Sequence, residues 1–510
     1  MLLDKYNVPY EIIEASDRYG GRVYTHHFET PEKPDFHSYY DVGAMRFPRI
    51  KSMDSVFKLF SELGLDSEGG IIKYIMDAPG NIRLFNALVP DKYLKFTYTR
   101  PGSTPLKGVE ALLADAYDPF KKKLVENFKE GWKYLMQFDN HSPPTYLSQV
   151  KGHPFSVIQW METMDASTLS YDLAFSETII DSIDFDYPHG PNHSRETVTE
   201  WFCVDGGTCV VTDRMAKKIR TNILYNRRVT AIAMDDPTSD DPAMKISVQG
   251  HPEYERKRYS HVISTAPLSC MRAMDLGQAG LDYAQNQALR GLGYGAAIKV
   301  GIKFKTRWWE KASGPAILGG VSSTDRPSRI VVYPSYGFKD PQDANGVLIA
   351  SYCWTQDALR LGSLIKGKGT DAEKTLLIII YKDLAELHGK DPQWYKDQTL
   401  DYHAYDWYHD QYSMGAVAYA SFGPGQFSNL YPELSKPAAK GNLHFVGEAT
   451  STNHAWIVGA LDSVHRAINE VFVKEQESDL IEKHAEDWEE GEVEQGYMAK
   501  LQCLRGILGV

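Results

Sequence analysis

The stretch that most limits how this chain can fold lies close to its start, at residues 10–22, YEIIEASDRYGGR. Residues 10–13 form a short apolar, β-branched run, which predicts a buried strand. Glu14 ends the run, and a loop with two adjacent glycines follows it. A carboxylate at the carboxyl end of a buried strand, beside a backbone that can approach a ligand closely, is typical of a dinucleotide-binding sheet. An ordinary strand with a Gly-Gly turn accounts for these residues equally well.

The usual dinucleotide-binding pattern is incomplete in this sequence. It consists of a strand, a G-x-G-x-x-G turn and a helix, with the acidic residue about twenty positions after the glycines. Counting back that far from Glu14 passes the first residue, Met1. Residues 1–7 instead have the pattern of the last turns of the crossover helix, which would end near Pro9. We therefore expect the first strand and its phosphate loop to be absent, because the sequence is part of a longer one or because the site is incomplete.

Composition and charge exclude several classes of protein. Of the 510 residues, 43% are hydrophobic and 24% are charged, so the chain can form a large core, and its length suggests two or three domains. A net charge of −12 argues against nucleic acid or an anionic membrane as a partner. No apolar run approaches the roughly 20 residues that span a bilayer, so we expect a soluble protein of unknown compartment, since a leader would precede a truncated start. The five cysteines have no C-x-x-C or other metal spacing, which argues against a disulfide framework and a metal site.

Helical and strand patterns alternate along the rest of the chain. Residues 52–65 have helical spacing, and residues 108–186 are almost entirely helical, which we interpret as a helical insertion. The predicted strands lie at 222–234, 244–248, 261–266, 296–304, 329–333, 347–354 and 443–446. One helix is predicted at 371–387 and another from about Trp456. The acidic segment after Glu475 predicts a solvated helix or disorder.

Three features outside the opening stretch are candidates for chemistry. Arg46 follows a tight Gly-Ala turn among apolar residues, an arrangement that can aim its guanidinium at a carboxylate, although a surface arginine at a helix start would look the same. Lys299 lies in the middle of a predicted strand, where a lysine is usually at an edge or facing solvent and only sometimes a buried functional amine. The helix from Trp456 begins with small residues, so its backbone N–H groups could face an anion or an electron-rich ring edge.

Taken in order, seven segments of the chain resemble the flavin-dependent amine oxidase family, and within it the L-amino acid oxidases. The segments are EASDRYGGRVYT at 14–25, GAMRFP at 43–48, the Gly-Gly turn at 206–207, VISTAP at 262–267, YGAAIKVGIKF at 294–304, a W-Y-x-D-x-Y-x-M-G run at 407–415 and GEATSTNHAWIVGALDS at 447–463. They extend over most of the chain, up to about residue 470. GAMRFP is the most discriminating, because it resembles enzymes that act on α-amino acids, including tryptophan monooxygenases. Amine oxidases whose substrates lack a carboxylate have no comparable need for its arginine.

The resemblance implies an α/β (α+β) fold with a Rossmann-like FAD-binding domain, a substrate-binding sheet domain and a helical insertion. The FAD-binding domain is expected to be discontinuous, because strands that are distant in the sequence contribute to it. Its expected pieces are 1–50, 200–270 and 440–472, without the first strand and glycine loop. The substrate-binding domain is expected at 271–439 with parts of 51–107, the helical domain at 108–199 and an acidic carboxy-terminal tail at 473–510.

The resemblance also assigns residues to FAD, the implied cofactor. Glu14 would hold the adenosine ribose, and Arg22 would meet the pyrophosphate. Val229 would contact the adenine, and Glu448 would face the ribityl and phosphate portion. The remaining implied contacts are Gly43, Ala44, Met45, Trp456 and Ile457, of which the last two lie by the flavin ring. No residues of the chain correspond to the family's phosphate-binding glycine loop.

A second set of residues is implied to hold the substrate. Arg46 and the hydroxyl of Tyr333 would clamp its carboxylate, and Trp456 with Tyr333 would wall the pocket. Ala455, which replaces the family's loop glycine, would offer its carbonyl oxygen to the amine. Lys299 matches the lysine that holds a water near flavin N5, and it is the implied catalytic residue.

The implied activity is FAD-dependent oxidative deamination of an L-amino acid by oxygen to a 2-oxo acid, ammonia and hydrogen peroxide. Two alternatives are an amide-forming flavin monooxygenase of an aromatic amino acid and a truncated, non-catalytic homologue that cannot hold FAD. Val417 is implied as a wall of the side-chain pocket. Aromatic walls would suit Leu, Phe or Met, whereas acids such as Asp205 would favour a basic substrate if they line the pocket. A homodimer is left open.

Overall fold

A six-stranded sheet is the largest β-structure of the computed structural model, which describes residues 1–28, 37–67, 69–85, 97–98, 106–165, 168–186, 198–311, 315–341, 344–418, 423–487 and 497–508. Its strands are β6 (Arg83–Leu84), β14 (Ala297–Phe304), β15 (Val321–Thr324), β16 (Ile330–Val332), β17 (Gly346–Trp354) and β18 (Thr399–Asp406). They lie in the order β18-β14-β17-β16-β15-β6. β14 is antiparallel to both of its neighbours and therefore lies inside the sheet.

Both faces of β14 are covered, which decides between the two interpretations of Lys299. Its even-numbered residues face a core that includes helix α13 (Asp371–His388), and its odd-numbered residues face a second core that includes Tyr40. The ring of Tyr40 packs so closely on Gly301 that a Cβ there would stand 2.3 Å from a ring carbon. Lys299 lies on this second face and is only 2% exposed. Of the two interpretations of Lys299, the buried amine is therefore the one that the structure shows, because β14 is a central strand.

Two separate pairs of parallel strands form the opposite end of the molecule. The strand predicted at residues 10–13 is β1 (Ile12–Ile13), which pairs with β10 (Ile223–Leu224). The second pair consists of β13 (Val262–Ser264) and β19 (Leu443–Phe445). Within the described part of the chain, neither β1 nor β13 has a strand on its other edge. An antiparallel pair, β11 (Val229–Met234) and β12 (Met244–Val248), adjoins them.

The helical insertion has a core of its own. Its helices are α4 (Gly108–Glu126), α5 (Phe128–Met136), α6 (Pro143–Gln149), α7 (Phe155–Asp165) and α8 (Phe175–Asp186). The buried rings of Phe120, Tyr146 and Phe175 pack together between them, with the last two stacked at 4.0 Å. This aromatic core explains why a segment with so many charged faces still folds as one compact group of helices.

The long helix α16 (Ile457–Lys474) connects the parallel strands to the carboxy-terminal segment. Its buried residues pack against α1 (Leu2–Lys5) and against α17 (Ser478–Asp487). His484 of α17 is 1% exposed, and its Nδ1 is hydrogen-bonded to the hydroxyl of Tyr6 at 2.9 Å. The final helix, α18 (Tyr497–Leu508), buries Cys503. The prediction of a solvated helix or disorder rests on the acidic run at 486–495, most of which lies outside the described residues; α17 is a largely exposed helix, and the burial of His484 and Cys503 was not predicted.

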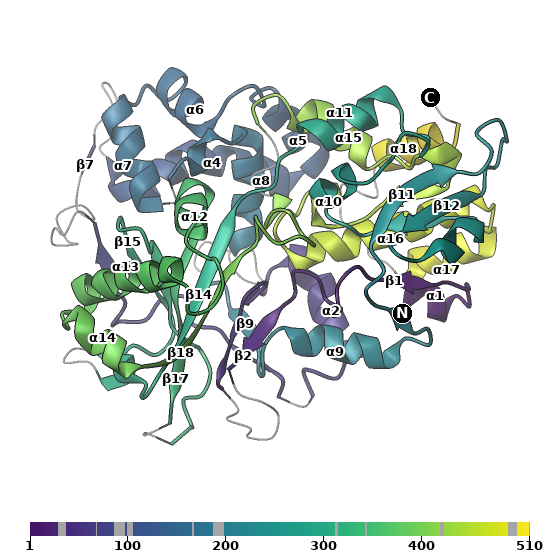
Figure 1. Ribbon diagram of the computed structural model, residues 1–510. Coiled ribbons are helices and arrows are strands. Elements are labelled where there is room, and N and C mark those ends of the chain that lie inside the picture. Colours follow the sequence, from purple (N-terminus) through teal and green to yellow (C-terminus); the bar gives the residue numbers. More distant parts are fainter. Residues whose placement is uncertain are drawn as a thin grey trace.

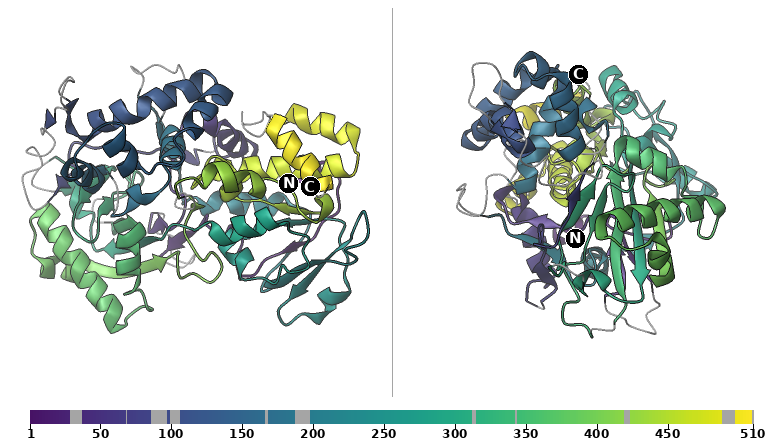
Figure 2. Two further views of the ribbon diagram at one scale, coloured as in Figure 1. Left: turned by 90° about the horizontal axis from the view of Figure 1, so that it is seen from above. Right: turned by 90° about the vertical axis from the view of Figure 1, so that its left-hand side faces the viewer.

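Figure 1 shows how these parts are arranged. The six-stranded sheet and α13 lie at the lower left, the helical insertion lies above them, and the strands β1, β11 and β12 lie at the right with α16. Both ends of the chain lie at this right-hand end, as the view from above confirms (Figure 2). The α/β fold class predicted from the sequence is confirmed.

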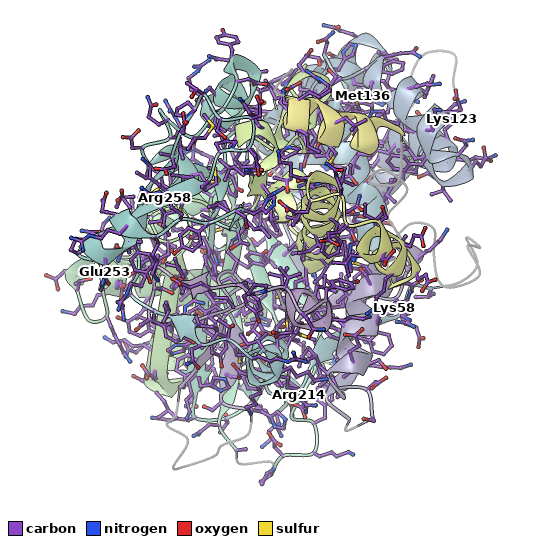
Figure 3. All side chains as sticks on the ribbon, turned by 90° about the vertical axis from the view of Figure 1, so that its right-hand side faces the viewer. Lys58, Lys123, Met136, Arg214, Glu253 and Arg258 are labelled. Atoms are coloured by element: carbon purple, nitrogen blue, oxygen red, sulfur yellow. The ribbon has the colours of Figure 1, made fainter. Side chains whose placement is uncertain are left out.

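Charged side chains are distributed over the surface of several elements. Lys58, Lys123 and Glu253 are exposed, and they lie along the outline of the molecule in Figure 3. Lys123 comes from the run of three lysines at 121–123, which does not form one exposed patch, because Lys121 is only partly exposed and lines a cavity. Among the described helices, none is long and apolar enough to cross a membrane.

Candidate active site

A cavity of about 1850 Å³ extends from the loop after β1 to the helical insertion. Pockets for single small ligands usually measure about 300–1,000 Å³, so this cavity has room for a large cofactor together with a substrate. At one end its lining comes from β1, β11 and β13, and at the other end from α4, α8 and β17. Most of the site residues predicted from the sequence line it: Glu14, Arg22, Gly43, Ala44, Met45, Arg46, Val229, Lys299, Val417, Glu448, Ala455, Trp456 and Ile457.

Glu14 is held at the carboxyl end of β1. Its backbone N–H donates to the carbonyl oxygen of Leu224 at 2.9 Å, which extends the β1-β10 ladder by one residue. One carboxylate oxygen accepts hydrogen bonds from both the N–H and the hydroxyl of Ser16, each at 2.7 Å. The carboxylate is thus fixed at the cavity wall, close to Val229 at the start of β11. This position at the carboxyl end of a strand agrees with the predicted contact between Glu14 and a ribose, which stays a prediction.

The Gly-Ala turn before Arg46 lies directly against the loop that follows β1. A Cβ on Gly43 would stand 1.7 Å from the carbonyl oxygen of Arg22, so only glycine fits this approach. The N–H groups of Val42 and Gly43 both donate to the carbonyl oxygen of Tyr24. Two motifs that are some twenty residues apart in the sequence are therefore brought together on one wall of the cavity.

Arg22 and Glu448 form an ion pair inside the cavity wall. The Nη1 of Arg22 donates to Glu448 Oε1 at 2.6 Å and to the carbonyl oxygen of Ala416 at 3.0 Å. The carboxylate of Glu448 also accepts the backbone N–H groups of Ala418 and Ala455. Burial alone would raise the pKa of the Glu448 carboxyl, but the guanidinium holds that pKa below its ordinary value. The two residues neutralise each other, so their predicted contacts with the pyrophosphate and the ribityl chain stay predictions.

Lys299 reaches the same wall from β14. Its Nζ donates to the carbonyl oxygens of Asp41 at 2.9 Å and Gly43 at 2.7 Å. The Nζ also lies 4.6 Å from the ring centroid of Tyr352. Burial lowers the pKa of the Lys299 ammonium to about 7, although the charge of Asp41 acts in the opposite direction. A lysine held in this way can change its protonation state at neutral pH.

Arg46 presents a guanidinium to the cavity from between two aromatic rings. Its Cζ lies 5.0 Å from the ring centroid of Phe185 and 5.7 Å from that of Trp201. Among the residues that the structure describes, no carboxylate forms an ion pair with it; its neighbours are the hydroxyl of Tyr74 and the sulfur of Met76, a weak acceptor 3.7 Å from Nη1. A partly desolvated cation without an anion is a strong candidate to bind a carboxylate ligand.

Tyr333 does not belong to the site. It is fully buried just after β16, where its hydroxyl donates to Ser322 Oγ at 3.1 Å and is hydrogen-bonded to His388 Nε2 at 2.8 Å. It does not line the cavity, so its predicted role in clamping the carboxylate is wrong. Tyr352 of β17 lines the cavity instead, and it lies directly opposite Lys299 in the β14-β17 register. That register could not be read from the sequence, which explains the error.

The amino end of α16 closes the middle of the cavity. Trp456 is the N-cap residue, and no side chain caps the first N–H groups of the helix. Its ring lies 6.3 Å from the rings of both Trp201 and Phe185, beside the Arg46 guanidinium. Ala455 adopts a positive φ of 67°. The resemblance implies a glycine at this position, and glycine adopts a positive φ without strain. The uncapped N–H groups can meet an electron-rich ring edge or an anion, as predicted from the small residues of this segment.

Within the described part of the chain, no group of three or more His, Cys, Asp or Glu side chains could hold a metal ion. The five cysteines are all free thiols. Asp205, which was considered as a possible pocket acid, lies outside the cavity lining and interacts with His37 at 3.2 Å.

These features define the class of the protein as a flavin-dependent amine oxidoreductase. The model of the flavin containing amine oxidoreductase family matches residues 1–471, and the chain belongs to this family. It is 39% identical to L-amino-acid oxidase 4 of Hebeloma cylindrosporum, covering 92% of this chain and 78% of that protein. It is 35% identical to a putative bifunctional amine oxidase of Dictyostelium discoideum, of which it spans about half (46%), and 28% identical to a putative L-amino-acid oxidase of Bacillus subtilis, covering 90% and 89% of the two chains.

Solved structures show the same fold. A putrescine oxidase bound to putrescine has a TM-score of 0.66 at 15% identity, covering 92% of this chain and 95% of that one. The cyclohexylamine oxidase of Brevibacterium oxydans has a TM-score of 0.63 at 16% identity, covering 90% and 92%. At such low identity these matches establish the architecture and nothing about the substrate.

The cofactor predicted from the sequence, FAD, is confirmed by the family. The residues that line the cavity also fit this group. Glu14 offers a fixed carboxylate for a ribose, the Gly43 turn leaves no room for a side chain beside the loop of Arg22, and the first N–H groups of α16 are uncapped. These three features lie along one continuous cavity, as an elongated dinucleotide requires.

Proposed function

We propose that the protein oxidises L-amino acids with oxygen and water to 2-oxo acids, ammonia and hydrogen peroxide. The observation that supports this proposal best is the Arg46 guanidinium, which faces the cavity without an anionic partner in the described structure. An amine without a carboxylate would have no use for this buried cation. The names of two relatives, L-amino-acid oxidase 4 and a putative L-amino-acid oxidase, agree with the proposal.

The residues around Arg46 can orient an amino acid. Arg46 binds the substrate carboxylate, and the hydroxyl of Tyr352 on the same cavity wall adds a second donor. The carbonyl oxygen of Ala455 accepts an N–H of the substrate amine. Because the carboxylate and the amine of the substrate are both held, the Cα–H bond points in a fixed direction. The protein thus contributes to catalysis by orienting the substrate. When bound, FAD supplies the two-electron oxidation of the Cα–N bond, and its reoxidation by oxygen gives hydrogen peroxide.

Two further features favour the reactive form of the substrate. Trp456, Phe185 and Trp201 make the wall around Arg46 apolar, so a substrate amine there is favoured in its neutral form. Lys299 donates two of its N–H bonds to the carbonyl oxygens of Asp41 and Gly43. Its third N–H has only the weak acceptor Met45 Sδ at 3.5 Å, so a water that hydrolyses the imino acid can compete for it, and its pKa of about 7 lets it take up or release a proton at neutral pH.

A product assay tests this proposal. The purified protein is supplied with FAD and incubated with each of the standard L-amino acids, and hydrogen peroxide, 2-oxo acid and amide are measured. We expect peroxide and 2-oxo acid in equal amounts from at least one amino acid. Amide as the main product would identify a monooxygenase instead. A flavin-loaded protein that gives none of these products with any amino acid would contradict the proposal.

A further inference from the structure

A carboxylate of the helical insertion faces the substrate end of the cavity. Asp181 of α8 lines the cavity together with Tyr352 and Trp456. Phe185, the residue whose ring lies 5.0 Å from the Arg46 guanidinium, follows Asp181 by four positions on the same helix. Side chains four apart lie about 6 Å from each other on one face of a helix. Asp181 therefore stands one helical turn from the aromatic wall that flanks Arg46, on the lining of the same cavity.

Asp181 is the acid of its cluster that lines the cavity, where the indole of Trp456 is its hydrogen-bonding neighbour. Its neighbour Glu177 interacts with the ring of His454, with 2.7 Å between Glu177 Oε1 and His454 Nδ1. Asp184 accepts a hydrogen bond of 2.7 Å from the side-chain amide of Asn453. Neither of these two acids lines the cavity, whereas Asp181 does, and no ion pair to Asp181 occurs within the described residues.

Burial and a neighbouring acid oppose the ionised form of Asp181, whereas two cationic groups nearby, His454 and Lys121, favour it. Burial raises the pKa of the Asp181 carboxyl to about 7, and the charge of Glu177 adds to the rise. The groups that face it from the elements packed around it are Glu177 and Asp184 on α8, Lys121 on α4, His454 and Trp456 before α16, and Tyr352 on β17. Of the three acids on α8, Asp181 is the one that lines the cavity, and a cationic ligand group placed beside it would favour its ionised form and be stabilised by it.

We propose that Asp181 selects the substrate side chain, so that the pocket favours L-amino acids whose side chain ends in a cation and rejects those that end in a carboxylate. This inference rests on the proposed oxidation of L-amino acids in the same cavity. Arg46 would bind the α-carboxylate at one end of the pocket, and Asp181 would bind a distal ammonium or guanidinium group at the other. An acidic side chain would place two carboxylates together in a partly buried site, which is strongly unfavourable.

A pair of unreactive ligands tests this arrangement by binding alone. 6-Aminohexanoate carries a carboxylate and a distal ammonium group but no α-amine, and hexanoate lacks the ammonium group. We expect the flavin-loaded protein to bind 6-aminohexanoate roughly tenfold or more tightly than hexanoate by titration calorimetry at pH 8, the effect of one charge-assisted pair. Equal affinities in the flavin-loaded protein would overturn the inference.

Three variants separate charge from structure. Asp181→Asn should remove the difference between the two ligands, and Asp181→Glu should keep most of it because the charge remains. Asp115→Asn is the matched control, since Asp115 lies on the outer side of α4, where it pairs with Lys151 at 3.0 Å, and does not line the cavity. It should leave the difference unchanged. An undiminished difference in Asp181→Asn would contradict the role of Asp181.

Turnover distinguishes a failure of this inference from a failure of the proposed function. If no L-amino acid gives peroxide with the flavin-loaded wild type, the proposed oxidase activity is wrong. If peroxide forms, the kcat/KM for L-lysine relative to L-leucine should fall roughly ten- to hundredfold in Asp181→Asn and stay constant in Asp115→Asn. Peroxide formation with an unchanged ratio in Asp181→Asn would leave the oxidase intact and overturn the selectivity.

Discussion

The two ends of the cavity are built in different ways. One end, where we propose that the substrate binds, is called the substrate end. There Lys299 and Tyr352 stand opposite each other on neighbouring strands of a six-stranded sheet, and an antiparallel ladder fixes their positions. The other end, where Glu14 and Arg22 are predicted to bind the nucleotide, is called the nucleotide end. There Glu14 follows a two-residue strand, and Arg22 lies in a loop that one ion pair connects to Glu448. A side chain on a central strand is held by many backbone hydrogen bonds, whereas a loop side chain depends on a few contacts.

This difference has a consequence for mutation. At the substrate end, changing one side chain should alter the chemistry and leave the fold intact. At the nucleotide end, changing one charged side chain should reduce the stability of the protein itself, because the remaining partner is buried and unpaired. The following changes test the contrast, from the largest expected effect to the smallest.

Removal of the Arg22 guanidinium should have the largest effect on stability. In Arg22→Ala, Glu448 would stay buried without its cation, so the free energy of unfolding should fall by about 3–5 kcal/mol. Denaturant unfolding measures this change. Arg18→Ala is the control, because Arg18 makes an exposed hydrogen bond of 2.8 Å to the carbonyl oxygen of Gly21, and its loss should cost less than about 1 kcal/mol. Equal losses of unfolding free energy in the two variants would contradict a special contribution of the Arg22–Glu448 ion pair to stability.

Removal of the Arg46 guanidinium should instead abolish most of the activity while the protein stays folded. We expect kcat/KM for L-amino acids to fall about 100- to 1000-fold in Arg46→Ala, because the substrate loses the cation that orients it. The flavin absorption band should be retained. Arg49→Ala, three residues away on an exposed position outside the cavity, should keep kcat/KM within about twofold of wild type. An active Arg46→Ala variant would exclude Arg46 from substrate binding.

The burial of Lys299 should make the stability of the protein depend on pH. Its pKa is about 7 in the folded protein, below the ordinary value of 10.5, so the unfolded chain binds more protons between these two values. Stability should therefore rise with pH from about 7 towards 10.5 and be lost as pH falls through 7, by up to about 1.4 kcal/mol per pH unit. The free energy of unfolding, measured at pH 7 and pH 8.5, should show this rise in wild type and a smaller one in Lys299→Met. An equal rise of the unfolding free energy with pH in both proteins would contradict a pKa of about 7 for Lys299.

Two tyrosines should respond in opposite ways to loss of their hydroxyl groups. Tyr352→Phe should lower kcat/KM about fivefold, the value of one neutral hydrogen bond to the substrate, with little effect on stability. Tyr333→Phe should leave kcat/KM unchanged and destabilise the fold by about 1 kcal/mol, because Ser322 and His388 lose a buried partner. Activity assays and denaturant unfolding of both variants measure these effects. A lower kcat/KM in Tyr333→Phe than in Tyr352→Phe would contradict the assignment.

Much of the architecture could be predicted from local patterns. The strands at residues 244–248 and 347–354 and the helix at 371–387 agree with β12, β17 and α13 to within one or two residues. The helical insertion was equally clear, because its apolar residues recur with helical spacing over a long segment. Short strands such as β1, with only two residues, were recognisable through the acid that ends them and the glycines that follow.

The errors concern packing between distant segments. Whether Lys299 is central or at an edge depends on β18, which follows it by about one hundred residues. Tyr333 and Tyr352 could not be told apart without the strand register, and Asp181 was not recognised because an acid on a helix is usually exposed. The burial of His484 and Cys503 was not predicted, because the charged composition of the carboxy-terminal segment is typical of a solvated one.

The reduction of the bound flavin without oxygen tests the central claim most directly, since that claim is that Arg46 makes the cavity a site for amino acids. The flavin-loaded protein is mixed with an L-amino acid or with the amine that lacks only its carboxylate, such as L-phenylalanine and phenethylamine or L-lysine and 1,5-diaminopentane. We predict that the amino acid bleaches the flavin absorption band at least about 100-fold faster than its matched amine, and that Arg46→Ala removes this difference. Equal rates for the amino acid and the amine in the wild type would contradict it.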